Sequence, residues 1–177
     1  MMLSKQKQQN AFEALKATQG YTNTFQAPRI TKIVVSSGTG KAKDKARNKL
    51  VEEKLARITG QKPSARPSKT SIAQFKMREG DIVGFQVTLR GERMYQFLDK
   101  LIHIALPRTR DFRGINTTAV DAMGNLTIGI KENSIFPETS DEDLKDVFGF
   151  AITVVTTAKS KSEATEFFRY LGIPFKK

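Results

Sequence analysis

The chain contains no cysteine and no tryptophan among its 177 residues, and it has a single histidine, His103. Without cysteine it can form no disulfide, no thiolate zinc site, no iron–sulfur cluster and no cysteine nucleophile. No apolar run approaches the ~18–20 residues that span a bilayer, and the polar first ten residues lack the apolar core of a signal peptide. We therefore expect a cytoplasmic protein without a membrane partner.

The sequence also lacks complete enzyme motifs. Gly38–Lys41 resembles part of a phosphate-binding loop, but a Walker loop needs a glycine where Val35 stands and a hydroxyl where Ala42 stands. The glycine spacing of a dinucleotide-binding motif is absent, and His103 has no carboxylate next to it in sequence that would mark it as a base. The acidic segment 138–146 lacks the ligand spacing of a calcium loop. We predict no catalytic residue, metal, cofactor or small-molecule substrate.

The chain has an excess of positive charge. Thirty Lys and Arg residues face eighteen Asp and Glu residues, which gives a net charge of +12. Residues 1–60 carry +8, residues 61–120 carry +6 and residues 121–177 carry −2. A net charge of magnitude ~2–8 is enough for solubility, so the basic excess indicates a polyanionic partner. The asymmetry predicts a basic, polyanion-binding part over about 1–120 and an acidic-leaning part over 121–177 with a different partner.

Three segments concentrate the basic residues, namely 41–49, 61–78 and 108–114. Lys and Arg neutralise phosphates and release counterions, and the neighbouring Ser, Thr, Gln and Gly residues suit contacts with the RNA backbone and 2′-hydroxyls. Taken singly, each segment is more typical of a solvated surface than of a binding site, but their concentration in one part of the chain favours binding. The usual single-strand modules are absent, and aromatic residues make up 8% of the chain. These features favour recognition of a structured duplex by its shape.

The hydrophobic pattern predicts a single α+β domain over 1–177, with a mainly antiparallel β-sheet flanked by α-helices. We expect an N-terminal helix that ends at Gly20, and a last helix with Ser162 as its N-cap. The other expected helices and strands are helices over 43–59 and 92–106, and strands over 30–35, 71–75, 82–89, 126–130 and 151–156. Residues 61–68 are expected to be a loop, and 76–81 the tip of a hairpin.

Several longer motifs resemble those of a known protein family. The most specific are Ile58–Pro63 (ITGQKP), Ser71–Gly80 (SIAQFKMREG), Val87–Met94 (VTLRGERM) and Leu106–Gly114 (LPRTRDFRG). The last third adds Gly124-Asn125, Ile135–Glu138 (IFPE) and Ile152–Lys159 (ITVVTTAK). In this order and at this length, the chain resembles the bacterial-type large-subunit ribosomal protein number five family, whose members bind 5S ribosomal RNA.

The resemblance implies a non-catalytic structural constituent of the large ribosomal subunit that binds 5S rRNA in the central protuberance. It further implies contacts with 23S rRNA, with peptidyl-site tRNA, with neighbouring ribosomal proteins, and with a small-subunit protein in an intersubunit bridge. The alternative that we consider is an extra-ribosomal RNA-binding protein with a regulatory or chaperone-like role.

The resemblance also assigns roles to individual residues. It implies rRNA binding by Ser36, Gln61, Lys62, Ser71, Thr88 and Arg90, to which we add Lys69 and Arg113 from the basic segments. The tRNA-proximal loop is expected to comprise Met77, Arg78, Glu79 and Gly80. The intersubunit bridge is expected to involve Glu138, Asp141, Glu142, Asp143 and Asp146. Two positions depart from the family pattern, because Ser36 stands where asparagine is usual and Pro67 where lysine is usual.

Overall fold

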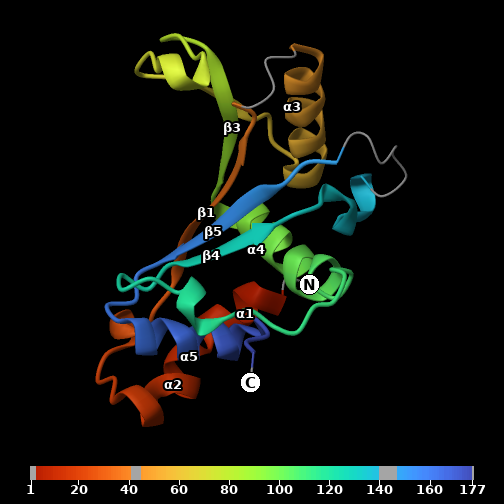
Figure 1. Ribbon diagram of the computed structural model, residues 1–177. Coiled ribbons are helices and arrows are strands. Elements are labelled where there is room, and N and C mark those ends of the chain that lie inside the picture. Colours follow the sequence, from red (N-terminus) through yellow and green to blue (C-terminus); the bar gives the residue numbers. More distant parts are fainter. Residues whose placement is uncertain (1–2, 41–44, 140–146, 177) are drawn as a thin grey trace. The chain divides into compact units, whose positions relative to one another are not determined.

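In a computed structural model that describes residues 3–40, 45–139 and 147–176, helices accompany a five-stranded antiparallel sheet of order β2-β3-β1-β5-β4 (Figure 1). The strands are β1 (Ile30–Gly38), β2 (Ser64–Pro67), β3 (Ile82–Leu89), β4 (Leu126–Ile130) and β5 (Phe150–Thr156). The α-helices are α1 (Leu3–Gln9), α2 (Ala11–Gln19), α3 (Lys45–Thr59), α4 (Gly91–Lys100) and α5 (Lys161–Leu171). The predicted α+β class with a mainly antiparallel sheet is confirmed.

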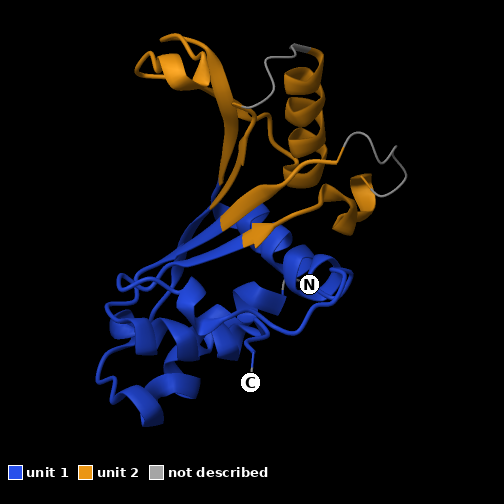
Figure 2. Cartoon of the chain, viewed as in Figure 1, with its two compact units in different colours: residues 1–33, 89–128, 153–177 blue, residues 34–88, 129–152 orange. Residues whose placement is uncertain are grey.

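Short turns connect these elements. The 3₁₀ turns are η1 (Thr24–Gln26), η2 (Ala73–Phe75), η4 (Thr117–Ala119), η5 (Asn133–Ile135) and η6 (Pro137–Thr139), and the π-helical turn η3 (Leu101–Ala105) follows α4. The chain divides into two compact units, which Figure 2 colours separately. Unit 1 comprises residues 1–33, 89–128 and 153–177, and unit 2 comprises residues 34–88 and 129–152.

Unit 2 has its core on one side of its strands. Along β3 the side chains of Phe85 and Val87 are buried, and α3 presents Val51, Leu55 and Ile58 as its buried stripe. Such a stripe at helical spacing, together with apolar residues at alternate strand positions, gives both elements one apolar side. Phenylalanine rings extend the core of this unit, with centroid distances of 5.9 Å for Phe136–Phe150 and 6.0 Å for Phe148–Phe150.

Unit 1 is built from helices that lie far apart in the sequence. Helix α1 packs against α2, α4 and α5, and α2 also packs against α5. The backbone N–H of Ser4 donates to the Asp99 carboxylate at 2.9 Å, and the Lys7 ammonium donates to the Leu171 carbonyl at 3.0 Å. These bonds fix α1 to two other helices of the unit.

Two predicted elements are wrong in the region before β3. Residues 61–68 were expected to be a loop, but Ser64–Pro67 forms strand β2, which pairs antiparallel with β3. Residues 71–75 were expected to be a strand, but Ala73–Phe75 forms the turn η2. The pairing explains the first error, because β2 gains its strand conformation from β3 and carries no alternating apolar pattern of its own.

Three helix predictions need correction. The single N-terminal helix is two helices, which are separated at Asn10. The helix expected over 92–106 continues beyond α4 as the π-helical turn η3. The N-cap of α5 is Ser160 rather than Ser162, because the Ser160 hydroxyl accepts the hydrogen bond from the Glu163 backbone N–H at 3.3 Å.

The other predicted boundaries agree closely. Helix α2 ends at Gly20 and α3 is followed by Gly60, and both glycines have positive φ angles, of 66° and 67°. The strands expected at 30–35, 82–89, 126–130 and 151–156 are present as β1, β3, β4 and β5. Within the described residues, no helix combines the length and the apolar character that a membrane span requires.

Candidate nucleic-acid interface

Unit 2 carries polar side chains on the sheet face opposite its core. Along β3, Phe85 and Val87 are buried, whereas Gln86 and Thr88 are half-buried. On the neighbouring strand β1, Ser36 also occupies a half-buried position between buried residues. Because successive residues of a strand point to opposite faces, Ser36 and Thr88 lie on the same, polar face. The structure thus places these two predicted site residues on adjacent strands.

Strand β2 extends this polar face at the edge of the sheet. Its register places Ser64 opposite Gln86 and Arg66 opposite Gly84, and residues directly opposite each other share a face. The register shifts between Arg66 and Pro67, as expected where a proline ends an edge strand. None of Ser64, Arg66 and Gln86 is among the residues predicted to bind rRNA, although Ser64 and Arg66 lie in the predicted basic segment 61–78. The alternation within β3 indicates Gln86, whereas the placement of the other two on this face depends on strand β2.

The turn from α3 to β2 fixes Gln61. The Thr59 hydroxyl lies 2.7 Å from the Leu55 carbonyl oxygen and 3.1 Å from the Gln61 carbonyl oxygen, and Gly60 supplies the left-handed residue that ends the helix. The side-chain amide of Gln61 then donates to the backbone carbonyl of Thr88 at 3.4 Å. Two residues 27 positions apart in sequence are thereby joined, and the amide of Gln61 is held beside the end of β3.

Lys62 and Lys69 remain at the surface. The Lys62 ammonium lies 3.8 Å from a carboxylate oxygen of Glu52, but the Lys62 side chain is 86% exposed. Exposed ion pairs of this kind contribute little to stability, so this cation can exchange Glu52 for a phosphate at small cost. Lys69 is exposed in the connection between β2 and β3.

The connection over residues 68–81, which we call the tip loop, is held by its own hydrogen bonds. The backbone N–H of Ser68 donates to the Asp81 carbonyl at 2.8 Å, and the Gly80 N–H donates to the Ser68 carbonyl at 3.0 Å. Further along, Ile72 and Met77 exchange two backbone hydrogen bonds, at 3.1 and 3.2 Å. The tip loop is therefore a defined structure, although residues 71–75 are not the predicted strand.

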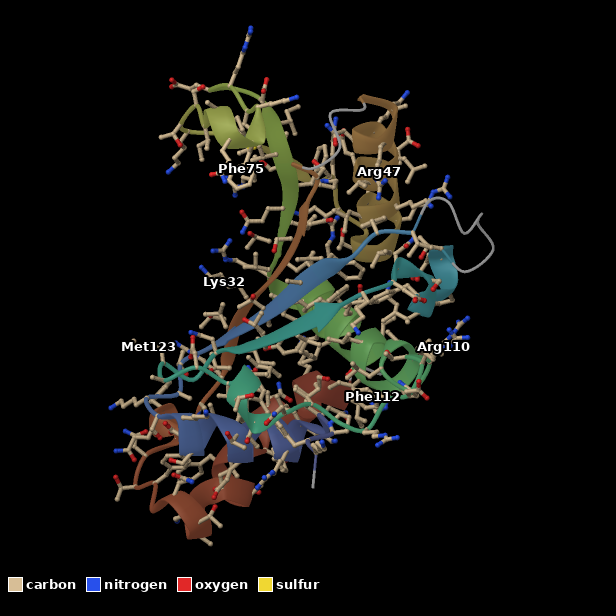
Figure 3. All side chains as sticks on the ribbon, in the orientation of Figure 1. Lys32, Arg47, Phe75, Arg110, Phe112 and Met123 are labelled. Atoms are coloured by element: carbon tan, nitrogen blue, oxygen red, sulfur yellow. The ribbon has the colours of Figure 1, made fainter. Side chains whose placement is uncertain are left out.

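The side chains of the tip loop are mostly exposed. Ser71 is exposed, and its hydroxyl donates to the Met77 carbonyl at 3.0 Å. Of the predicted tRNA-proximal residues, Met77 is half-buried, whereas the remaining three, 78–80, are exposed. Phe75 is 63% exposed and belongs to this loop (Figure 3). Sequence reasoning assigned Phe75 to a strand and so missed it as a surface group.

In unit 1 a second basic loop, residues 107–114, is anchored at its end. Gly114 has a φ of 95°, and a Cβ there would lie 2.7 Å from the backbone nitrogen of Lys176. The Ile115 N–H donates to the Pro174 carbonyl, and the Lys176 N–H donates to the Ile115 carbonyl, both at 2.8 Å. The C-terminal segment therefore fixes the chain immediately after Arg113.

The loop 107–114 presents its cations to solvent. Its three arginines, Arg108, Arg110 and Arg113, are exposed, and no carboxylate pairs with them in the part of the chain that the structure describes. Phe112 is half-buried between them. Arg90, the other predicted site residue of unit 1, is exposed at the N-cap of α4.

The predicted bridge residues fall mostly outside the described residues. Glu138 is exposed in η6, whereas Asp141, Glu142, Asp143 and Asp146 lie outside the described ranges. Among the residues that the structure describes, no three histidine or carboxylate side chains are grouped so that they could hold a metal ion.

Exposed cations beside hydroxyl and amide groups are the side-chain types that contact RNA backbones in proteins. Residues 23–78 match the family model described as ribosomal protein L5, and residues 82–175 match the model of the C-terminus of the same ribosomal family. The chain belongs to the ribosomal protein L5 family.

Its curated relatives are similar over nearly their whole length. The large ribosomal subunit protein uL5 of Rubrobacter xylanophilus is 50% identical over 170 residues, which cover 95% of this chain and 94% of the relative. The proteins of the same name from Natranaerobius thermophilus and Desulfotalea psychrophila are each 48% identical, covering 91% and 93% of this chain and 90% and 92% of their own. The chain is thus an rRNA-binding, non-enzymatic protein of the large ribosomal subunit in the cytoplasm, as the sequence predicted.

Proposed function

We propose that this chain binds 5S rRNA in the central protuberance of the large subunit through the polar sheet face of unit 2. The observation that carries the proposal is the hydrogen bond from Gln61 to the Thr88 carbonyl, 3.4 Å long. It fixes an amide at the end of a strand whose half-buried positions include Gln86 and Thr88. Amide and hydroxyl groups that are fixed before binding lose little entropy on meeting RNA.

The chemistry of this face suits an RNA backbone. Hydroxyl groups both donate and accept hydrogen bonds, as does the amide of Gln61. The 2′-hydroxyls and phosphates of an A-form helix offer the complementary groups across a shallow minor groove. Arg66 and Lys62 are exposed beside this face and supply the charge that phosphates require. Direct reading of base edges plays a smaller part in this mode of binding.

Three further contacts complete the proposed role. The basic loop 107–114 of unit 1 contacts 23S rRNA, and the tip loop approaches peptidyl-site tRNA with Arg78 and its neighbours. The acidic segment 138–146 meets a small-subunit protein in an intersubunit bridge. The supports for these assignments are the exposed arginines of 107–114, the exposed residues 78–80 and the family membership.

Mobility-shift titrations of the full chain test the 5S assignment. At ~150 mM salt, 5S rRNA is expected to bind more tightly than an unrelated duplex RNA of equal length. The variants Gln61→Ala and Thr88→Ala should each weaken 5S binding by roughly 1–3 kcal/mol, because each leaves a partner group in the complex unsatisfied. Thr165→Ala, which removes a hydroxyl from α5 in unit 1, is the matched control and should bind normally.

Two results would overturn the assignment. One is equal affinity for 5S rRNA and the unrelated duplex. The other is unchanged 5S affinity in both Gln61→Ala and Thr88→Ala, provided that circular dichroism finds both variants folded.

A further inference from the structure

Unit 1 contains a cleft that the proposed 5S surface does not use. It lies between the α1–α2 region and residues 24–29, and it has a volume of about 260 Å³. Its lining includes Gln9 and Phe12 from the helical side, and Phe25, Pro28 and Arg29 from the other. This volume is just below the ~300 Å³ at which pockets for drug-sized ligands begin. The cleft therefore suits a single small group rather than a drug-sized ligand.

Phe25 is the most exposed of the large apolar side chains in the described residues, at 90%. Its backbone is nevertheless held firmly. The Asn23 carboxamide accepts from the Phe25 N–H at 3.0 Å, and the Gln26 carboxamide accepts from the backbone N–H groups of Thr22 and Asn23, at 2.8 and 3.2 Å. This reciprocal capping box fixes the turn η1. A rigid turn thus presents an aromatic ring to solvent, where it contributes almost nothing to the core.

One cation lies over a ring of the cleft, and a second cation is among the residues that line it. The Lys16 ammonium lies 5.5 Å from the centroid of the Phe12 ring. The backbone of Arg29 is clamped by Thr157, with its N–H donating to the Thr157 hydroxyl and its carbonyl accepting from the Thr157 N–H, both at 3.0 Å. The Arg29 side chain is exposed, and no carboxylate pairs with it among the described residues. Positive charge beside an open aromatic ring is complementary to a nucleotide, which has a π-face and a phosphate.

We propose that this cleft binds an unpaired nucleobase of ribosomal RNA, stacked on Phe25, with the adjoining phosphate beside Arg29. The exposed carboxamide of Gln9, which lines the cleft, is placed to hydrogen-bond the edge of the base. The proposal rests on the family membership and does not require 5S rRNA to be the partner. It gives unit 1 a stacking contact with single-stranded RNA, distinct from the duplex-reading face of unit 2.

The absence of tryptophan from the chain allows a direct test. In the full-length variant Phe25→Trp the only tryptophan lies at the proposed stacking position, and its fluorescence is quenched when a base stacks on it. Titration with short single-stranded oligouridylate and oligoadenylate should give saturable quenching. Met123→Trp is the matched control, because Met123 is 72% exposed in the same unit and does not line the cleft. Quenching in neither variant, or equal quenching in both, would overturn the proposal.

Affinity measurements provide a second readout. Phe25→Ala should weaken binding of the single-stranded oligonucleotides roughly fivefold or more, as expected when one base–aromatic stack is lost. Arg29→Gln should reduce the slope of log affinity against log salt by about one. If Phe25→Ala weakens duplex RNA binding as much as single-strand binding, the stacking site is refuted.

The assignment of 5S rRNA to unit 2 can be wrong without affecting the test of the cleft. Introduced into the Phe25→Trp variant, Gln61→Ala should leave the oligonucleotide quenching unchanged, because Gln61 belongs to unit 2. Loss of the quenching in this double variant would contradict a separate site in unit 1.

Discussion

The two basic loops of the molecule are held in place in different ways. The tip loop of unit 2 is held by hydrogen bonds among its own residues, such as those between Ile72 and Met77. The loop 107–114 of unit 1 is held at its end by the C-terminal segment, through Ile115 and Lys176. A locally bonded loop can keep its shape by itself, whereas the loop of unit 1 depends on a segment some sixty residues away. We expect mutations to affect the two loops accordingly.

The two units also differ in charge. Unit 1 carries sixteen basic and seven acidic residues, and unit 2 carries fourteen basic and eleven acidic residues. The proposed 5S surface therefore lies in the unit with the smaller excess of positive charge. This is consistent with a division in which fixed polar groups supply specificity and unit 1 supplies most of the salt-sensitive, sequence-independent attraction.

The largest effect is expected from Gly114→Ala. A Cβ at this position would lie 2.7 Å from the Lys176 nitrogen and 2.8 Å from the Phe175 carbonyl carbon, at a φ of 95°. The backbone contact and the strained φ together should lower the free energy of unfolding by about 2–5 kcal/mol. Urea unfolding followed by circular dichroism measures this loss.

Gly20→Ala separates the two causes of that loss. Gly20 also has a positive φ, of 66°, but its Cβ would meet no atom within 4 Å. This variant should therefore lose only the backbone term, about 1 kcal/mol. Equal losses in the two variants would mean that the C-terminal segment does not constrain the loop 107–114.

A smaller effect is expected from neutralising the arginines of that loop. Because this loop is assigned to 23S rRNA, the triple variant Arg108→Gln, Arg110→Gln, Arg113→Gln should weaken binding to a 23S rRNA fragment and to an unrelated duplex alike, by roughly 10–100-fold. The slope of log affinity against log salt should fall by about two to three, close to one for each lost phosphate contact. Salt titrations in a filter-binding assay measure both quantities.

Lys5→Gln is the control for this variant, since the Lys5 ammonium already lies 3.4 Å from the Glu92 carboxylate. It should change the slope by less than one. If the triple variant weakens binding to the 23S rRNA fragment but not to the unrelated duplex, the loop is a specificity element and the division between the units is wrong.

Features held by neighbouring residues could be predicted from the sequence, whereas features held by distant residues could not. The apolar alternation of β3 and β5 is local, so their positions follow from pattern alone. Strand β2 carries no such pattern, and its existence depends on hydrogen bonds from β3. The anchoring of Gly114 by Lys176 depends on the folded chain, and the residues around Gly114 carry no pattern that would indicate it.

Part of the candidate site could likewise be predicted from the sequence, and part of it could not. Gln61 and Thr88 were identified from the resemblance. The bond that joins Gln61 to Thr88 is a long-range contact and needed the structure. The cleft at Phe25 combines residues of α1 and α2 with the turn η1, and no local motif indicates it.

A third prediction concerns the buried pair that joins residue 21 to α5 in unit 1. The Tyr21 hydroxyl donates to the Glu163 carboxylate at 2.5 Å, and burial, together with this bond, raises the pKa of Tyr21 well above its ordinary value. Tyr21→Phe should lower the free energy of unfolding by about 1–2 kcal/mol near neutral pH, as loss of a bond to a charged group does. Tyr170→Phe, whose hydroxyl has no bond to Glu163, is the control.

The same pair predicts an alkaline pH dependence. Unfolded tyrosine releases its proton near pH 10, whereas folded Tyr21 retains it to higher pH. The stabilisation is therefore fully present below about pH 10 and is lost as the pH rises through the folded pKa. Tyr21→Phe should flatten the decline in urea midpoint above this pH. A decline as steep as that of the unmodified chain would exclude Tyr21 as its source.

The smallest effect is expected in the tip loop, from Ser71→Ala. The Ser71 hydroxyl donates to the Met77 carbonyl at 3.0 Å at an exposed position, so its loss should lower the free energy of unfolding by about 0.5 kcal/mol. The two backbone hydrogen bonds between Ile72 and Met77 remain, and the amide exchange rates at these residues should therefore change less than threefold, in line with ~0.6 kcal/mol. Much faster exchange there would show that the side chain of Ser71, rather than the local backbone bonds, holds the tip loop in shape.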